Sequence, residues 1–186
     1  MNDEALLEQS LAGDSAAFGE LVRKYQDRLF NTLLRLTGCR EEAEDVAQEA
    51  FVQAYFKLHT FQQNSAFYTW LYRIAFNVGI SRRRRRRHEM SVDWGKEVAG
   101  AEPVDDLEMP EVRLEREERA EQLQEAIQTL SEEHRAILIL REMEGCCYET
   151  IAEVLDLPIG TVRSRLHRAR MQLRDYLKEA LGEPAA

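Results

Sequence analysis

The segment YETIAEVLDLPIGTVRSRLHRARMQLRDY, residues 148–176, decides how the rest of the chain is interpreted. It predicts two short helices, the first over residues 148–155, separated by a tight turn at Asp156 and Leu157. Pro158 suits the start of the second helix, because a missing N–H has little consequence in a first helical turn. Residues three or four apart in the second helix form one apolar stripe: Val162, Leu166, Ala169, Leu173 and Leu177.

The other faces of this second helix are basic. Asp175 is the only acid between Asp156 and Glu179, so the helix lacks the regular acidic partners that a self-paired surface helix has. An apolar back and an arginine-rich front suit the major groove of DNA, where helix–turn–helix modules place their second helix. The alternative is a merely solvated helix face. The basic residues are Arg163, Arg165, His167, Arg168, Arg170 and Arg174.

Composition limits the class of protein. The chain has 186 residues, 44% of them hydrophobic, and a net charge of −9. No apolar run approaches the ~20 residues of a membrane span, and the acidic N-terminus is unlike a signal peptide, so we expect a cytoplasmic protein without membrane insertion. The net charge argues against nucleic-acid binding, but its distribution matters more than its sum. Bases cluster at 82–87 and 163–174, and acids at 41–49 and 93–125.

Cysteines and histidines predict neither a disulfide framework nor a metal site. The three cysteines include the adjacent pair Cys146 and Cys147, and the four histidines are scattered without ligand spacing. We therefore expect no metal and no cofactor. The cysteine pair is interpreted as part of a turn or a packing position, with a redox role as the alternative.

The N-terminal half predicts three helical segments, at about 4–36, 40–58 and 70–81, with Asp14 as an N-cap within the first. Acids at the start of the second segment suit a helix N-terminus, and alternatively form a docking surface. Residues 59–69 predict a polar loop with interleaved aromatic rings, and Arg82–Arg87 follow the third helix. Rings that stack bases, next to cations that bind phosphates, are typical of single-stranded DNA binding. Trp70 begins an apolar stripe and is interpreted mainly as a core residue.

The whole chain predicts an all-α fold of two small helical domains joined by a flexible acidic linker. The linker is assigned to residues 91–111, where acids dominate and two prolines interrupt any helix. The flanking domains cover residues 1–90 and 112–181, and a tail covers 182–186. The second domain is expected to contain four helices, with Ser131 as an N-cap and the helix–turn–helix at its end.

Three motifs, in this order, resemble the extracytoplasmic-function (ECF) class of bacterial sigma factors. They are DVAQEAFVQAY at 45–55, SAFYTWLYRIAFN at 65–77 and GTVRSRLHRAR at 160–170. The resemblance implies a non-enzymatic transcription initiation factor that binds core RNA polymerase. It would direct the polymerase to promoter DNA through −35 and −10 contacts and promote melting. It also implies control by an anti-sigma factor, and no small-molecule substrate.

The resemblance further implies roles for individual residues. The −35 element would be contacted by Tyr148, Arg163, Ser164, His167, Arg168 and Arg170. The −10 element would be contacted by Phe61, Asn64, Ser65, Ala66, Phe67, Asn77, Arg82, Arg83 and Arg84, with a pocket in the loop for a flipped base. The polymerase would be bound by Asp45, Gln48, Glu49, Phe51 and Tyr55, some of whose apolar members must serve the protein's own core.

Two positions depart from the family pattern. Ser81 replaces a common aspartate, and Asp156 replaces a common glycine in the turn, where a left-handed backbone would be strained unless aspartate tolerates it. Two other classes remain as alternatives. One is a helix–turn–helix regulator whose N-terminal helices sense or dimerise. The other is a small enzyme, for which the sequence offers no nucleophile, base and orienting group.

Overall fold

The computed structural model describes residues 2–89 and 110–180, and the side chains of 84–89 and 110–117 lie outside that description. Within these ranges every regular element is helical, which confirms the all-α prediction. The predicted tail and most of the predicted linker lie outside the described residues, although Pro110 already begins a helix. The elements are α1 (Asp3–Leu11), α2 (Ser15–Thr37), α3 (Arg40–Lys57), η1 (Leu58–Thr60), α4 (Phe67–Glu89), α5 (Pro110–Thr129), α6 (Glu132–Leu138), η2 (Ile139–Met143), α7 (Tyr148–Leu155) and α8 (Ile159–Ala180).

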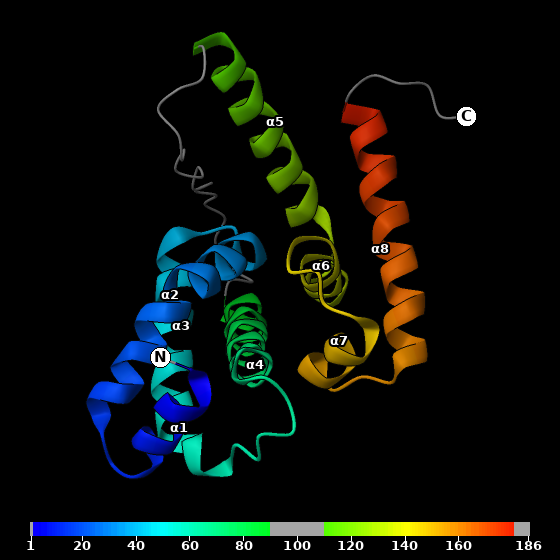
Figure 1. Cartoon of the computed structure of the whole chain (residues 1–186). Coiled ribbons are helices and arrows are strands. Elements are labelled where there is room, and N and C mark those ends of the chain that lie inside the picture. Colours follow the sequence, from blue (N-terminus) through cyan, green and yellow to red (C-terminus); the bar gives the residue numbers. More distant parts are fainter. Residues whose placement is uncertain (1, 90–109, 181–186) are drawn as a thin grey trace.

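The first four α-helices form the N-terminal unit, with α2, α3 and α4 packed on one another (Figure 1). The segment predicted to be helical over 4–36 is two helices. Gly13 adopts a positive φ, and Asp14 caps α2 as predicted, by accepting from the Ala16 N–H at 2.9 Å. Helical spacing aligns apolar residues of α2, α3 and α4 on their facing sides. The fully buried members include Leu21, Leu29, Leu33, Val46, Ala50, Ala54, Leu71, Ala75 and Phe76.

Helix α4 is longer at both ends than the sequence predicts. It starts at Phe67 rather than Trp70, and it continues through the arginine run to Glu89. The early start follows from the Ala66 carbonyl, which accepts from the N–H groups of Thr69 and Trp70. Arginine is a good helix former, so the run extends α4 instead of ending it.

The C-terminal unit contains α5 to α8, which confirms the predicted four-helix domain with a helix–turn–helix. The side chain of Ser131 caps α6 by accepting from the His134 N–H. The helix beginning there widens at η2, where the Glu144 N–H bonds the Ile139 carbonyl five residues earlier at 3.1 Å. This segment ends at Met143, and Gly145, two residues later, has a positive φ of 67°. Glu144 directly follows this widened turn.

The two units contact each other in the described structure. Figure 1 shows α4 lying between the other N-terminal helices and α7, and α4 and α7 pack directly together. Buried apolar side chains continue from one unit into the other. The charged pair Arg73 of α4 and Asp156 of the α7–α8 turn lies across this contact at 4.0 Å.

The carbonyl end of α2 is covered by side chains of the C-terminal unit and by Arg83 of α4. The last carbonyls of a helix have no partner inside the helix and need donors from elsewhere. The Arg35 carbonyl accepts from the side-chain amides of Gln124 at 3.2 Å and Gln128 at 2.9 Å. The Leu36 carbonyl accepts from Arg135 at 2.9 Å and from Arg83 at 2.7 Å. Cationic donors also suit the negative end of the helix dipole.

Arg135 is the largest fully buried side chain, with only 1% of its surface exposed. Besides Leu36, its guanidinium donates to the carbonyls of Ile127, Gln128 and Leu130 at 2.6–3.0 Å. A buried charge is tolerated when its donors are satisfied. Arg135 therefore joins the end of α5, the start of α6 and the end of α2. Within the described residues, no helix is both long and apolar enough to cross a membrane.

We predict that Arg135→Met strongly destabilises the chain. Methionine fills much of the space, but it removes a buried donor from four carbonyls. The carbonyls of Leu36 and Ile127 keep a second donor, Arg83 and the Leu130 N–H, whereas those of Gln128 and Leu130 lose their guanidinium bonds. Unsatisfied buried polar groups cost about 1–3 kcal/mol each before relaxation, so we expect the free energy of unfolding to fall by about 3 kcal/mol or more. Urea denaturation of the full chain measures it.

The matched control is Arg174→Ala. Arg174 is an exposed arginine that pairs with its neighbour Asp175. A surface substitution of this kind should change the free energy of unfolding by about 0.5 kcal/mol or less. Equal effects of the two substitutions would contradict the role given to Arg135.

Candidate nucleic-acid interface

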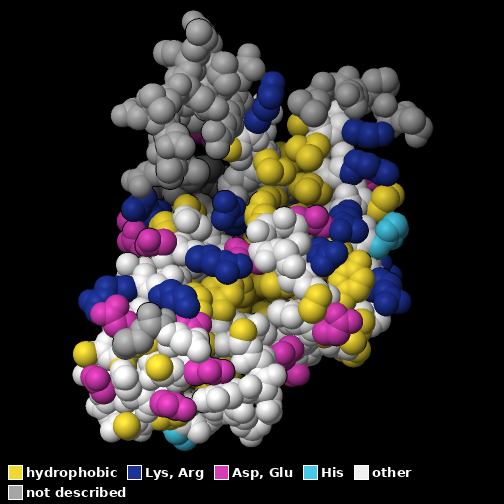
Figure 2. All heavy atoms as spheres, in the orientation of Figure 1, with side chains coloured by type: hydrophobic (Ala, Val, Ile, Leu, Met, Phe, Trp, Pro, Cys, Tyr) yellow, Lys and Arg dark blue, Asp and Glu magenta, His cyan; other side chains and the backbone are white. Residues whose placement is uncertain are grey.

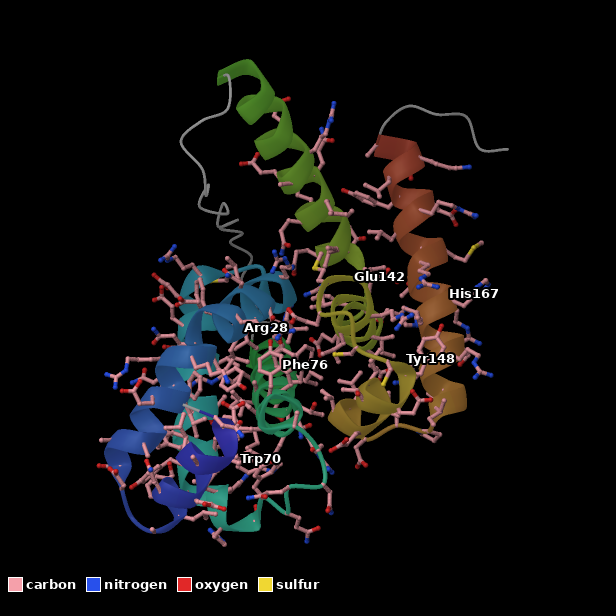
Figure 3. The ribbon with its side chains drawn as sticks, viewed as in Figure 1. Arg28, Trp70, Phe76, Glu142, Tyr148 and His167 are labelled. Carbon is pink, nitrogen blue, oxygen red and sulfur yellow. The ribbon has the colours of Figure 1, made fainter. Side chains whose placement is uncertain are left out.

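Helix α8 presents a basic face to solvent. Pro158 starts it, because its carbonyl accepts from the N–H groups of Thr161 and Val162. The stripe residues Val162, Leu166 and Ala169 are buried as predicted, and Leu173 and Leu177 are half-buried. Figure 3 shows His167 on the outer side of α8, and Figure 2 shows Lys and Arg side chains gathered along this helix. The residues Arg163, Ser164, His167 and Arg168 are all exposed on it.

The turn before α8 contains Asp156, the residue that stands in place of a common glycine. Asp156 adopts the left-handed conformation, with φ of 53° and ψ of 51°, and its N–H bonds the Ala152 carbonyl. Aspartate is among the few non-glycine residues that visit this region readily. The turn therefore keeps the tight geometry that the helix–turn–helix needs without a glycine.

Tyr148, at the start of α7, lies between two arginines. The guanidinium of Arg141 is 5.1 Å from the centre of its ring, and that of Arg163 is 5.9 Å away. Such cation–ring contacts restrict a long side chain. Tyr148 thus lies beside the first arginine of the basic face, near the N-terminal end of α8, where helix–turn–helix modules contact base edges.

Two arginines of α8 are held by acids of the same unit. Arg170 donates to the carboxylate of Glu142 through Nε at 2.9 Å and also through Nη2. Arg165 pairs with Glu133 at 3.0 Å. Arg170 would have to exchange Glu142 for a DNA phosphate, whereas sequence reasoning treated it as an available cation.

The loop between η1 and α4 contains an aromatic cluster. The ring of Phe61 lies 6.0 Å from Phe67 and 5.2 Å from Trp70, and the latter two lie 5.8 Å apart. Phe67 is buried and Trp70 is half-buried, so both belong mainly to packing. The exposed polar edge of the loop is formed by Asn64, whose side chain donates to Gln62 at 3.2 Å.

The other residues predicted for this loop differ in exposure and position. Ser65 is half-buried and Ala66 is exposed. Asn77 is exposed on α4, ten residues after Phe67, which places it about 15 Å farther along the helix. The structure therefore groups Phe61, Asn64, Ser65, Ala66 and Phe67 and leaves Asn77 apart. Gln63 at the loop tip has φ of 55° and was not singled out by the sequence.

Arg82 and Arg83, which follow the apolar part of α4, make contacts within the protein. Arg82 donates to Asp45 at 3.0 Å and to Glu49 at 2.9 Å, and Arg83 donates to the Leu36 carbonyl. Arg82 therefore lies beside the acids predicted to bind polymerase, not apart from them. The side chain of Arg84 lies outside the described part of the structure.

Helix α3 carries an accessible surface with both acids and apolar side chains. Asp45, Gln48 and Tyr55 are exposed and Glu49 is half-exposed, whereas Phe51 is only 8% exposed and packs in the core. The exposed apolar residues that the sequence reasoning missed are Val52 and Phe56, at 49% and 71%. Gln48, Val52 and Phe56 are each four residues apart and so lie on one face of α3, different from the buried face. This spacing was the signal in the sequence that could have identified Val52 and Phe56.

The cysteine pair occupies two different environments. Cys147 is exposed at the N-cap of α7, where its sulfur accepts from the Thr150 N–H at 3.5 Å. Cys146 is half-buried, and burial, followed by the nearby charge of Glu144, raises the pKa of its thiol. Among the described residues, no group of three His, Cys, Asp or Glu side chains could hold a metal ion.

Comparison with known proteins gives the same family for both units. The model of sigma-70 region 2 matches residues 21–89, and that of sigma-70 region 4 matches residues 120–173. The chain is 41% identical to the RNA polymerase sigma-H factor of Pseudomonas aeruginosa, over 97% of this chain and 96% of that relative. It is 36% identical to the ECF RNA polymerase sigma factor SigW of Bacillus subtilis, over 93% and 95%.

Solved structures agree with these relatives. The sigma factor RpoE of Bartonella quintana, in complex with the anti-sigma factor NepR, matches with a TM-score of 0.69 and 26% identity. This match covers 87% of this chain and 96% of that one.

We predict that thiol-reactive reagents label Cys147 well before Cys146. The thiolate is the reacting form, so a raised pKa leaves less of it at any pH below that pKa, and burial also restricts access to Cys146. Labelling at pH 7.5 with an alkylating reagent, followed by fragment mass spectrometry, gives the order. Cys147→Ser retains a capping hydroxyl and should leave only slow labelling at position 146. Faster reaction at Cys146 would contradict the burial described here.

Proposed function

The chain belongs to the sigma-70 family of RNA polymerase sigma factors, ECF class, and from this premise we propose which of its residues perform each step. As a sigma factor it is a non-enzymatic initiation factor that directs core RNA polymerase to promoters. The observation that carries the proposal is the pairing, in one chain, of an exposed basic recognition helix with an aromatic-lined loop. We expect it to act in the cytoplasm, with promoter DNA and core polymerase as its partners.

The −35 element is proposed to be contacted by the N-terminal half of α8. Arg163, Ser164 and His167 reach base edges, and Tyr148, Arg168 and Arg170 contact phosphates. An arginine that reads guanine through two hydrogen bonds contributes about 1–3 kcal/mol of discrimination, whereas phosphate contacts set register and affinity. The exposure of Arg163, Ser164, His167 and Arg168 on one helix supports this assignment.

The −10 element is proposed to be read by the loop before α4. Phe61, Asn64, Ser65, Ala66 and Phe67 would form the pocket for a base flipped out of the non-template strand. Unstacking a base costs a few kcal/mol, which a pocket that contacts its face and edge can offset. Asn77 and the arginines Arg82, Arg83 and Arg84 would contact DNA farther along α4.

Core polymerase is proposed to dock on the exposed face of α3. We retain Asp45, Gln48, Glu49 and Tyr55 and add Val52 and Phe56, whose apolar side chains are exposed without an evident structural need. Phe51 is assigned to the core. Arg82 would then compete with the polymerase for Asp45 and Glu49.

The two units must separate for promoter binding. Arg73 and Asp156 are in contact across the two units. Adding the helical rise from Phe67 to Arg73 and the greatest length that the chain from Asp156 to Arg163 could span gives an upper limit of about 50 Å between the Cα atoms of Phe67 and Arg163. The −35 and −10 elements are nominally about 25 base pairs apart, which is roughly 85 Å of duplex. The described closed arrangement is therefore proposed to be the free or inhibited form. An anti-sigma factor is the expected regulator, since the structural relative RpoE was solved in complex with the anti-sigma factor NepR.

The assignment is tested by run-off transcription with purified core polymerase and a genomic fragment library, with and without this protein. We expect new transcripts that share two upstream elements at a fixed spacing. Arg163→Ala should reduce their yield about tenfold or more, given the discrimination lost at one base pair. Binding of the variant to core polymerase should be unchanged.

The control for this prediction is Arg174→Ala, near the other end of α8 and paired with Asp175. It should leave transcription within about twofold of the unmodified protein, because an exposed ion pair such as that of Arg174 with Asp175 contributes little. Equal loss of polymerase binding and transcription in Arg163→Ala would refute the −35 assignment.

A further inference from the structure

A nearly buried carboxylate crosses from the C-terminal unit into the N-terminal one. The side chain of Glu144 is only 7% exposed, and it accepts hydrogen bonds from three donors of the other unit. Arg28 donates through Nε at 3.0 Å, Tyr68 through its hydroxyl at 3.2 Å, and Thr32 through its hydroxyl. In Figure 3, Arg28 lies on the side of α2 that faces the C-terminal helices.

The site that receives Glu144 belongs entirely to the N-terminal unit. Arg28 and Thr32 are one turn apart on α2, and Tyr68 lies in the first turn of α4. The Arg28 guanidinium lies 4.1 Å from the centre of the Tyr68 ring, so the two make a cation–π contact. Burial, and then the charge of Glu144, raises the pKa of Tyr68, so its hydroxyl stays protonated as a donor.

This donor set suits an oxyanion generally, not a glutamate specifically. A planar guanidinium and two hydroxyls match the non-bridging oxygens of a phosphate as well as the two oxygens of a carboxylate. An aromatic ring beside the cation, here that of Tyr68, is also typical of sites that bind single-stranded nucleic acids. In this structure the Glu144 oxygens stand in for such phosphate oxygens.

The site adjoins the loop that is proposed to hold the flipped base. Tyr68 directly follows Phe67 in the chain, and the ring of Tyr25 contacts both, at 5.7 Å from Phe67 and 5.3 Å from Tyr68. The Tyr25 and Tyr68 rings are stacked, with an interplanar angle of 23°. A strand with one base in the loop would have its next phosphates within reach of this stack, since successive phosphates are only several ångströms apart.

We propose that Arg28, Thr32 and Tyr68 form a binding site for a backbone phosphate of the melted promoter strand, and that Glu144 occupies this site while the two units are closed. The proposal rests on the −10 function assigned above and extends it to Arg28 and Thr32, which lie outside the sequence motifs, and to Tyr68, which lies within the motif at 65–77 but had no role assigned. Glu144 is thus an internal competitor. Separation of the units removes the carboxylate and opens the site at the same time.

The test uses the full chain and a fluorescein-labelled 12-nucleotide oligothymidine, with affinity measured by fluorescence anisotropy over a range of salt concentrations. Glu144→Gln keeps the size of the side chain and removes the competing charge. We expect its affinity to rise about fivefold or more, because a larger fraction of the protein is competent to bind. The logarithmic salt dependence should steepen by about 0.7, the value for one additional phosphate contact on a single strand.

Four further substitutions decide whether the gain comes from this site. Arg28→Ala or Tyr68→Phe, each combined with Glu144→Gln, should remove most of the gain, and Arg28→Lys should retain part of it. Glu153→Gln, an exposed acid of α7, makes the same change in net charge and should have little effect. An equal gain in Glu153→Gln, or a gain that survives Arg28→Ala, would overturn the proposal.

A third measurement separates nucleic acid from polymerase as the occupant. If Glu144→Gln strengthens binding of core polymerase without strengthening oligothymidine binding, the site receives a polymerase group and the proposal is wrong. The oligothymidine assay itself needs neither polymerase nor a promoter. Failure of the sigma-factor assignments in the run-off assay, with an intact Arg28-dependent gain, would therefore be recognised as a separate outcome.

Discussion

The carbonyl end of α2 is the constraint on which the closed structure depends. Its last peptide groups lie between the two units, where water is largely excluded, so they require donors from the protein. Arg135, Arg83, Gln124 and Gln128 provide them. Gly38 permits this close approach, because a Cβ at that position would lie 2.6 Å from the Gln128 side chain. The position of α5 and α6 against α2 follows from these bonds.

The contact between the units combines polar ties with a continuous apolar interior. The hydrogen bonds of Arg135 and Glu144 can be replaced by water or by a ligand, which makes the contact reversible. The apolar part costs free energy to expose, at about 25 cal/mol for each Å². The open form therefore needs a partner that covers the exposed surface, and polymerase with promoter DNA is that partner in our account.

Sequence reasoning succeeded where the signal is local. The helix–turn–helix, the course of α3 and the caps at Asp14 and Ser131 follow from helical spacing and from capping preferences. It failed where the deciding partner is distant. Glu144 and Arg135 read as ordinary charged residues, because Arg28 and Leu36 lie 116 and 99 positions away in the chain. Helical spacing also offered two faces on α3, and only packing places Phe51 inside and Phe56 outside.

The distance between the two units tests the central claim of a closed form that opens on the promoter. Spin labels on cysteines introduced at the exposed positions Asp27 and Met171, with the native cysteines replaced, report it by pulsed electron resonance. The account predicts one short, narrow distance in the free protein. It predicts a lengthening of roughly 30 Å or more with core polymerase and promoter DNA, as expected from the length of duplex between the two elements. A long, broad distribution in the free protein, or a short distance retained in the promoter complex, would contradict it.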